Sequence, residues 1–186
     1  YLTSEEIEKD KEYLFSISSK LRDKNIISLI IGGPTQYYDY SDRNIQEIFS
    51  KVNYLVKENN LNLVVIPSMR TPKGTIEHAK IYFGNDHLVL DGVDKKAYLS
   101  ALAISKHIVV TCDSSSMISE AALTGKPIYV ATIPPKKSDK RFKNFRKLFQ
   151  EMNIVKELGE KLENWNYEKL DETNRVANII KDKIQL

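Results

Sequence analysis

Short apolar runs alternate along the chain with segments in which apolar residues recur every three or four positions. Five runs have the length and continuous apolar character of strands buried on both faces of a parallel sheet. They cover residues 25–33, 61–68, 87–92, 106–114 and 126–131. The periodic segments between them predict helices. These helices cover a segment that begins near Ser41, then residues 75–82, 95–104 and 116–123, and a segment that begins near Ser138.

Strands that alternate with helices across short polar turns predict an α/β fold. We expect a Rossmann-like parallel sheet with helices on both faces, in a single domain that spans residues 1–186. Thr3 and Glu6 form a capping-box signature that opens a lead-in helix over residues 1–24. The tail, residues 160–186, combines a loop over 162–173 with a final helix.

Composition and charge describe an ordinary globular protein. Hydrophobic residues make up 41% and charged residues 28% of the chain, and the net charge of +3 is too small to indicate nucleic-acid binding. The single cysteine excludes an internal disulfide, which favours a reducing, cytoplasmic location. No apolar run approaches the roughly 20 residues of a membrane span. The abundance of Lys, Asn and Ile favours an AT-rich bacterial genome.

Polar, glycine and cationic residues follow the predicted strands. In open parallel sheets, ligands bind outside the carboxyl ends of the strands, so these residues converge on one edge. We therefore expect the binding site there. In chain order, they are Gly32, Gly33 and Thr35; Ser68, Arg70 and Thr71; Asp91 and Gly92; residues 113–116; and Thr132, Pro134 and Lys136.

The stretch VTCDSSSMISEAALTGKPIYV, residues 110–130, places three serines between a strand and a helix. A helix N-terminus suits phosphate because its amide groups are unpaired and carry partial positive charge. Ser115 and Ser116 would add hydroxyl donors, and Glu120 would accept hydrogen bonds from the vicinal hydroxyls of a ribose. Alternatively, Asp113 or Ser114 only caps the helix and Glu120 is a solvated surface residue. The spacing leaves both interpretations open.

Other candidates also have a structural interpretation beside the functional one. The pair Gly32–Gly33 matches neither GxGxxG nor a P-loop, and a plain turn would explain it. Arg70 is either a diphosphate clamp or an ordinary loop residue. The basic segment, residues 136–147, favours a solvated helix face, and only Lys136 and Arg141 lie near enough to the strand edge to contact a ligand.

Several chemistries find little support in the sequence. The three tyrosines of residues 37–40 either stack on a ligand or pack within their own loop. The histidines are scattered without the spacing of metal ligands, so we expect no metal site. Cys112 at a strand end is typical of a small buried hydrophobe. The serine turn also lacks the GxSxG elbow of hydrolases.

Five segments, in this order, resemble the family of Elm-type mitochondrial fission proteins and their bacterial relatives. They are GGPT, PSMRTP, VVTCDSSSMISEAALTGKPIYV, RFKNF and LENWNYEKLDETNRVA, and the likeness runs from about residue 25 to 180. The resemblance implies a likeness to two-domain GT-B glycosyltransferases, with this chain as the C-terminal half. Because the chain opens with Tyr1, we expect a fragment from which an N-terminal domain is missing.

The resemblance also implies a nucleotide-sugar donor site. The glycine loop and the helix start at residues 115–117 would hold the diphosphate, and Glu120 in an ExxxxGxP-like run would hold the ribose. The loop 91–93 would lie near the base. The family more often has arginine at Met69, alanine at Cys112 and histidine at Arg146. Inverting enzymes of this fold need no metal, so we expect no metal and no cofactor.

These observations lead to one hypothesis and two alternatives. The hypothesis is the donor-binding half of a GT-B-type glycosyltransferase-like protein, inactive in isolation and without an identified catalytic base. The alternatives are a scaffold or interaction protein that uses the basic segment as its contact surface, and a nucleotide-sugar epimerase. The candidate ligand-binding residues are Gly32, Gly33, Thr35, Ser68, Arg70, Asp91, Ser114, Ser115, Ser116, Met117, Glu120, Lys136 and Arg141.

Overall fold

Six parallel strands form one sheet in the order β3-β2-β1-β4-β5-β6. The structure is a computed structural model and describes residues 2–170 and 172–184. The strands are β1 (Ile26–Ile31), β2 (Asn62–Pro67), β3 (Leu88–Val89), β4 (His107–Thr111), β5 (Ile128–Ala131) and β6 (Val155–Glu157). All six residues of the central strand β1 are buried, as expected for a strand covered on both faces.

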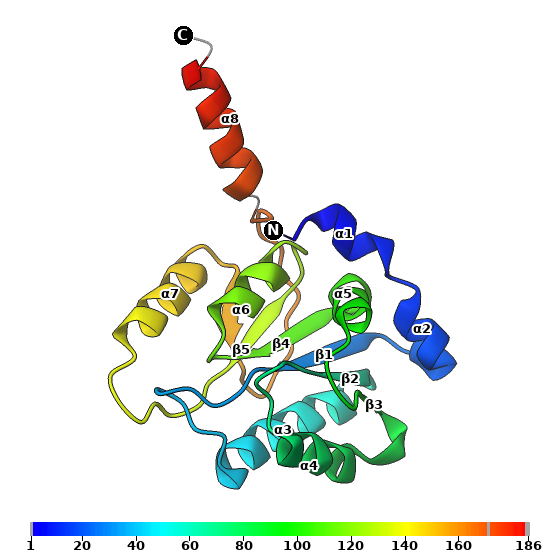
Figure 1. Ribbon diagram of the computed structural model, residues 1–186. Helices are drawn as coiled ribbons and strands as arrows, with labels where there is room; N and C mark the ends of the chain where they lie inside the picture. Colours follow the sequence, from blue (N-terminus) through cyan, green and yellow to red (C-terminus); the bar gives the residue numbers. More distant parts are fainter. Residues whose placement is uncertain (1, 171, 185–186) are drawn as a thin grey trace.

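Helices cover both faces of the sheet. Figure 1 shows α3 (Asp42–Glu58) and α4 (Lys73–Phe83) on one face and α5 (Lys95–Ile104) and α6 (Ser115–Ala122) on the other. The short 3₁₀ turn η2 (Gly84–Asp86) follows α4, and α7 (Lys140–Glu151) packs against β6. The predicted fold class is therefore confirmed: a Rossmann-like α/β fold with a parallel sheet and helices on both faces.

The strand order reverses direction between β1 and β4. Strands β2 and β3 lie on one side of β1. The chain then returns through α5, and β4 pairs with the other side of β1. Such a reversal opens a crevice at the carboxyl ends of the two strands, which is where open α/β sheets bind ligands. The loops after β1 and β4 meet at this point.

The prediction of one lead-in helix over residues 1–24 is wrong, because the segment is not a single continuous helix. The segment contains α1 (Ser4–Lys9), α2 (Tyr13–Ile17) and the 3₁₀ turn η1 (Ser19–Arg22). The predicted capping box of α1 is present. The break has a tertiary cause, because Ser100 of α5 accepts from the backbone N–H of Leu14 at 3.1 Å and donates to the carbonyl of Lys11 at 2.8 Å.

The C-terminal part of the chain differs from the prediction just before the tail of residues 160–186. Strand β6 was not predicted, and residues 158–170 form a loop that packs Trp165 edge-on against Tyr129 of β5, with ring centroids 5.2 Å apart. The final helix α8 (Glu172–Ile184) projects from the body of the domain (Figure 1). Among the helices of the described residues, none has both the length and the apolar character that a bilayer crossing requires.

Candidate functional site

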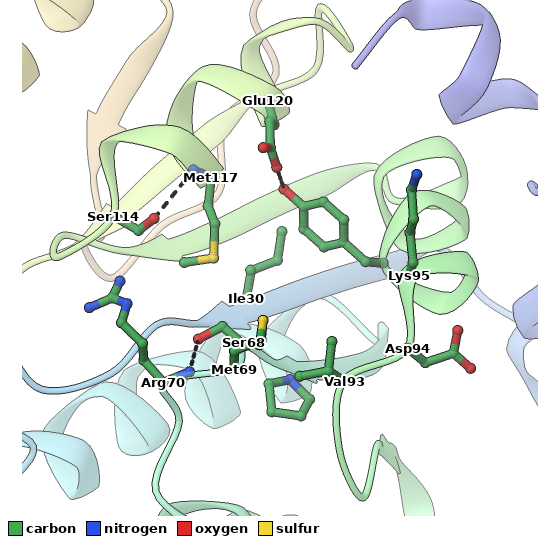
Figure 2. Close-up of a pocket in the computed structure, with 12 residues that line it drawn as sticks. Ile30, Ser68, Met69, Arg70, Val93, Asp94, Lys95, Ser114, Met117 and Glu120 are labelled. Carbon is green, nitrogen blue, oxygen red and sulfur yellow. Dashed lines mark hydrogen bonds between the residues drawn. The ribbon is translucent and has the colours of Figure 1, made fainter. Parts of the chain in front are cut away.

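A cavity of about 390 Å³ lies at the carboxyl edge of the sheet, between the loop after β2 and the helices α5 and α6 (Figure 2). Its lining combines an apolar floor with a few convergent polar groups, as ligand sites commonly do. The residues that line it are Ile30, Pro67, Ser68, Met69, Arg70, Val93, Asp94, Lys95, Tyr98, Ser114, Met117 and Glu120. Five of the thirteen predicted site residues belong to this set: Ser68, Arg70, Ser114, Met117 and Glu120.

The N-terminus of α6 forms part of the cavity wall. Ser114 is the capping residue, because its backbone is extended and its hydroxyl accepts from the amide of Met117 at 3.4 Å. Of the two caps that the sequence allowed, Ser114 is therefore confirmed. The other amides of the first turn have no partner inside the helix, and they carry the positive end of its dipole.

Asp113 has a different function from capping. Its buried carboxylate accepts from the amide of Gly33 at 3.0 Å, the hydroxyl of Tyr40 at 2.5 Å and the guanidinium of Arg70 at 2.8 Å. The guanidinium also donates to the carbonyl of Gly33 at 3.1 Å. A single buried carboxylate thus joins the loops that follow β1, β2 and β4, and it fixes the orientation of Arg70 at the cavity.

The glycine pair is required by this close packing. A Cβ atom on Gly32 would lie 2.1 Å from the carboxylate of Asp113, and one on Gly33 would lie 2.0 Å from the carbonyl oxygen of Arg70. Both amides are already used within the chain, since Gly32 donates to Thr111 at 2.8 Å and Gly33 donates to Asp113. Packing alone therefore accounts for both glycines, and a contact with phosphate stays a prediction.

Glu120 is half-buried and accepts a hydrogen bond from the Tyr98 hydroxyl at 2.5 Å, the dashed line at Glu120 in Figure 2. The interpretation of Glu120 as a freely solvated residue is therefore wrong. Burial raises the pKa of Tyr98, and the negative charge of Glu120 raises it further, so the phenol stays protonated and acts as the donor.

Sequence reasoning missed Tyr98 and its neighbours Asp94 and Lys95 on the opposite wall. Asp94 caps α5, accepting from the amide of Ala97 at 3.1 Å and from the Tyr13 hydroxyl at 2.8 Å. Its position three residues before Ala97 is a readable capping signal. Tyr98 and Glu120 are 22 residues apart in the sequence, and no local sequence pattern predicts their contact.

A second group of predicted residues lies outside this cavity. Ser115, Ser116 and Arg141 line a separate hollow of about 350 Å³ between α6 and α7, together with Ser119, Phe142 and Phe145. The N-terminus of α6 therefore has a hollow on each side.

The other predicted residues are engaged elsewhere or lie apart. Asp91 is exposed and pairs with Lys80 of α4. Thr35 accepts from the amides of Tyr37 and Tyr38 at 3.1 Å, and the amide of Lys136 donates to the Tyr37 carbonyl at 2.6 Å. Thr35 and Lys136 thus belong with the tyrosine loop, residues 37–40, whereas Asp91 lies apart from it.

The tyrosine loop packs on the protein itself. Tyr38 is fully buried, and its hydroxyl bonds to Asp139 and accepts from Arg146 at 2.8 Å. Arg146 also pairs with Asp139 at 3.0 Å. The hydrogen bond from Tyr38, followed by those from Arg146, holds the pKa of Asp139 below its ordinary value.

Cys112 is not poised as a nucleophile, and the side chains that the structure describes form no cluster suited to a metal ion. Cys112 is buried, and burial raises the pKa of its thiol to about 11, as expected for a structural cysteine. Among the side chains that the structure describes, those of residues 2–170 and 176–184, no three of His, Cys, Asp or Glu lie close enough together to hold a metal ion. The cavity therefore offers hydrogen-bonding groups, the guanidinium of Arg70, the ammonium of Lys95, the carboxylates of Asp94 and Glu120, and the dipole of α6.

Comparison with known families gives a match over almost the whole sequence. The profile of the family described as Mitochondrial fission ELM1 matches residues 1–184. The chain belongs to the mitochondrial fission ELM1 family. The resemblance proposed from the sequence motifs is thus confirmed.

Two curated relatives of the ELM1-family chain are similar to it over part of their length. One is an uncharacterized protein of Rickettsia prowazekii (strain Madrid E), 29% identical over 171 residues, which cover 88% of this chain and 48% of that protein. The other is the mitochondrial fission protein ELM1 of Arabidopsis thaliana, 32% identical over 111 residues, which cover 58% of this chain and 24% of that protein. The chain thus spans half or less of the curated relatives it matches.

Solved structures with a similar fold come from UDP-binding proteins. The S. aureus MnaA–UDP co-structure is similar with a TM-score of 0.57 and 21% identity, over 77% of this chain and 36% of that one. The UDP-GlcNAc 2-epimerase from Neisseria meningitidis bound to UDP-GlcNAc is similar with a TM-score of 0.53 and 14% identity, over 94% of this chain and 40% of that one. At these identities the likeness concerns the fold of the ELM1-family chain.

Proposed function

We propose that this ELM1-family chain binds the nucleoside diphosphate part of a nucleotide sugar, as the donor-binding half of a GT-B-type glycosyltransferase-like protein. One observation carries the proposal. The half-buried carboxylate of Glu120, the capped N-terminus of α6 and the oriented guanidinium of Arg70 surround one cavity, at the point where the strand order of the sheet reverses. The carboxylate of Glu120 and the capped N-terminus both belong to α6, the guanidinium of Arg70 belongs to the loop after β2, and all three line the same cavity.

Each part of the cavity suits one part of the ligand. The first-turn amides of α6 and the guanidinium of Arg70 would bind the diphosphate, because both present N–H donors and positive charge. Arg70 uses one N–H for Asp113 and one for Gly33, which leaves further donors for phosphate. Glu120 would accept from the ribose hydroxyls, and the apolar side chains of Met69 and Val93 would cover the base.

The same groups would serve the departing diphosphate of a donor. Negative charge grows on the leaving group during sugar transfer, and preorganised dipoles and cations stabilise it without the help of a metal. Arg70 lies at the cavity, whereas the exposed Lys136 follows β5 and would reach a ligand only by extension from its loop.

Calorimetric titration with UDP, GDP and ADP tests the proposal. We expect saturable binding of one nucleotide and roughly tenfold or greater weakening in Glu120→Gln, because a hydrogen bond to a charged acceptor is lost. The glutamine oxygen can still accept from Tyr98, which protects the fold. Glu47→Gln on α3 is the matched control and should bind as the wild type does. Absence of binding to all three nucleotides, or an unchanged affinity in Glu120→Gln, would contradict the proposal.

Epimerisation is the second candidate, favoured by the fold likeness to a UDP-GlcNAc 2-epimerase. Both reactions need the nucleotide site, so the titration does not separate them. Proton NMR of the nucleotide sugar with the full-length protein does: an epimerase interconverts the sugar without releasing nucleoside diphosphate, whereas a transferase releases it when an acceptor is present. A chain that binds no nucleotide would favour the scaffold alternative, with the basic segment of residues 136–147 as its contact surface.

A further inference from the structure

We propose that Tyr98 is a positioning residue that holds the carboxylate of Glu120 in the orientation that accepts a ribose, so that the site selects ribonucleotides over 2′-deoxyribonucleotides. The inference rests on the proposed function. It concerns a residue of α5 for which neither the sequence pattern nor the family resemblance suggested a function.

The contact itself is directional. The Tyr98 hydroxyl donates to Oε2 of Glu120 at 2.5 Å, and both side chains line the same cavity. Within the described part of the chain, the other oxygen, Oε1, accepts no hydrogen bond from a side chain or a backbone amide outside its helix. An ionised carboxylate offers about four acceptor positions, so the bond from Tyr98 leaves acceptor capacity toward the cavity.

The direction of the bond is stable across the physiological pH range. Burial comes first and the charge of Glu120 second among the causes that raise the pKa of Tyr98. The phenol therefore remains the donor of this hydrogen bond. A free glutamate on a flexible stem would lose rotamer freedom when a ligand bound, whereas a glutamate that is already held loses little.

Tyr98 is well placed for this function because α5 is anchored on both sides of it. At the start of the helix, Asp94 accepts from the Tyr13 hydroxyl at 2.8 Å. Two residues after Tyr98, buried Ser100 accepts from the amide of Leu14 at 3.1 Å. The segment that contains α2 thus fixes the helix that carries Tyr98, and Tyr98 in turn fixes Glu120.

A matched set of titrations tests the inference. UDP, GDP and ADP are titrated first, and the nucleotide that binds is then compared with its 2′-deoxy form. The comparison is repeated on Tyr98→Phe and on Tyr82→Phe. The second variant is the control, because it removes a hydroxyl that bonds only to Ser50, at 3.2 Å, on the opposite face of the sheet. Thermal unfolding confirms that both variants are folded.

We expect the wild type to prefer the ribonucleotide by about tenfold or more. In Tyr98→Phe, the affinity for the ribonucleotide should fall by about three- to tenfold while the affinity for the deoxy form changes less, so that the preference shrinks. Tyr82→Phe should keep both affinities.

Three results would overturn the inference while the proposed function stands: unchanged affinities for both nucleotides in Tyr98→Phe, an equal loss of affinity for both, or tighter binding of the ribonucleotide. An equal loss would indicate that Tyr98 is merely structural. Tighter binding of the ribonucleotide would indicate that the Tyr98 hydroxyl competes with the ribose for Glu120. If the wild type binds none of the nucleotides, the proposed function fails, and the inference fails with it.

Discussion

At the scale of single residues, the site depends on how closely three loops approach one another. Asp113 joins them, and Gly32 and Gly33 leave the space that the approach needs. Neither glycine has a positive φ, so the requirement is steric and not conformational. This distinction leads to a prediction for substitution.

Gly33→Ala should lower the free energy of unfolding by about 1–3 kcal/mol, because its methyl group would collide with the backbone of Arg70 and overpack the loop. It should also weaken nucleotide binding, since Arg70 would move. Gly74→Ala is the control: nothing lies within 4 Å of the added methyl group, and in helix α4 alanine should stabilise by about 0.5–1 kcal/mol. Urea unfolding of both variants measures the difference, and equal effects would refute the steric argument.

The pairing of Asp139 with Tyr38 and Arg146 predicts a pH dependence. The pKa of Asp139 is lower in the folded state than its ordinary value of 3.8, so the folded state favours the carboxylate. Its contribution to stability is therefore fully present above the ordinary pKa and is lost as the pH falls through the lower, folded pKa.

Asp139→Asn should therefore destabilise the protein by about 1–3 kcal/mol at pH 7, where the charged partner Arg146 loses its carboxylate. The difference from the wild type should shrink near pH 3. Urea unfolding at both pH values measures it. A deficit of the same size at both values would show that the loss is one of packing and not of charge.

At the scale of elements, apolar runs and periodicity predicted five of the six strands and the helices between them. Strand β6 escaped because it has only three residues, with Lys156 at its centre. The lead-in helix was wrong because tertiary hydrogen bonds from Ser100 compete with its backbone pairing. The position of Glu120 beside the carboxyl edge of the sheet was predictable because it follows a strand and a capped turn. Its partner Tyr98 was not, because that contact depends on how α5 packs beside α6.

Ser100→Ala tests the anchoring of α5 by the N-terminal segment. The change leaves the amide of Leu14 without its partner, so we expect a loss of about 1–3 kcal/mol. Hydrogen exchange at that amide should accelerate. Ser16→Ala is the control, since Ser16 is exposed and bonds only within its own turn, to the carbonyl of Tyr13. Unchanged exchange at Leu14 would mean that the segment is held by other contacts.

At the scale of the whole molecule, the strand order sets the position of the site. The chain doubles back between β3 and β4, and the cavity forms where the loops on either side of the reversal face each other. Ligand binding there bridges the two halves of the sheet and should stabilise the fold as a unit.

A nucleotide that binds only the folded state, at 100 times its Kd, should stabilise the protein by about 2.7 kcal/mol. For a chain of this size, the expected rise in Tm is about 5–10 °C. Thermal unfolding with and without the nucleotide measures it. Glu120→Gln at the same nucleotide concentration should show a clearly smaller rise, and an equal rise would place the stabilising ligand elsewhere on the chain.

The most direct test of the central claim is to locate the bound nucleotide by NMR. The amide spectrum of the isotope-labelled chain would be recorded during titration with the nucleotide that binds, and separately with pyrophosphate. We predict shifts of the amides of residues 93–98 and 114–117 with the nucleotide. With pyrophosphate, only the second of these groups should shift. Nucleotide-induced shifts confined to the basic segment of residues 136–147, and equal for both ligands, would contradict the account, because they would show anion binding at the surface and an unused cavity.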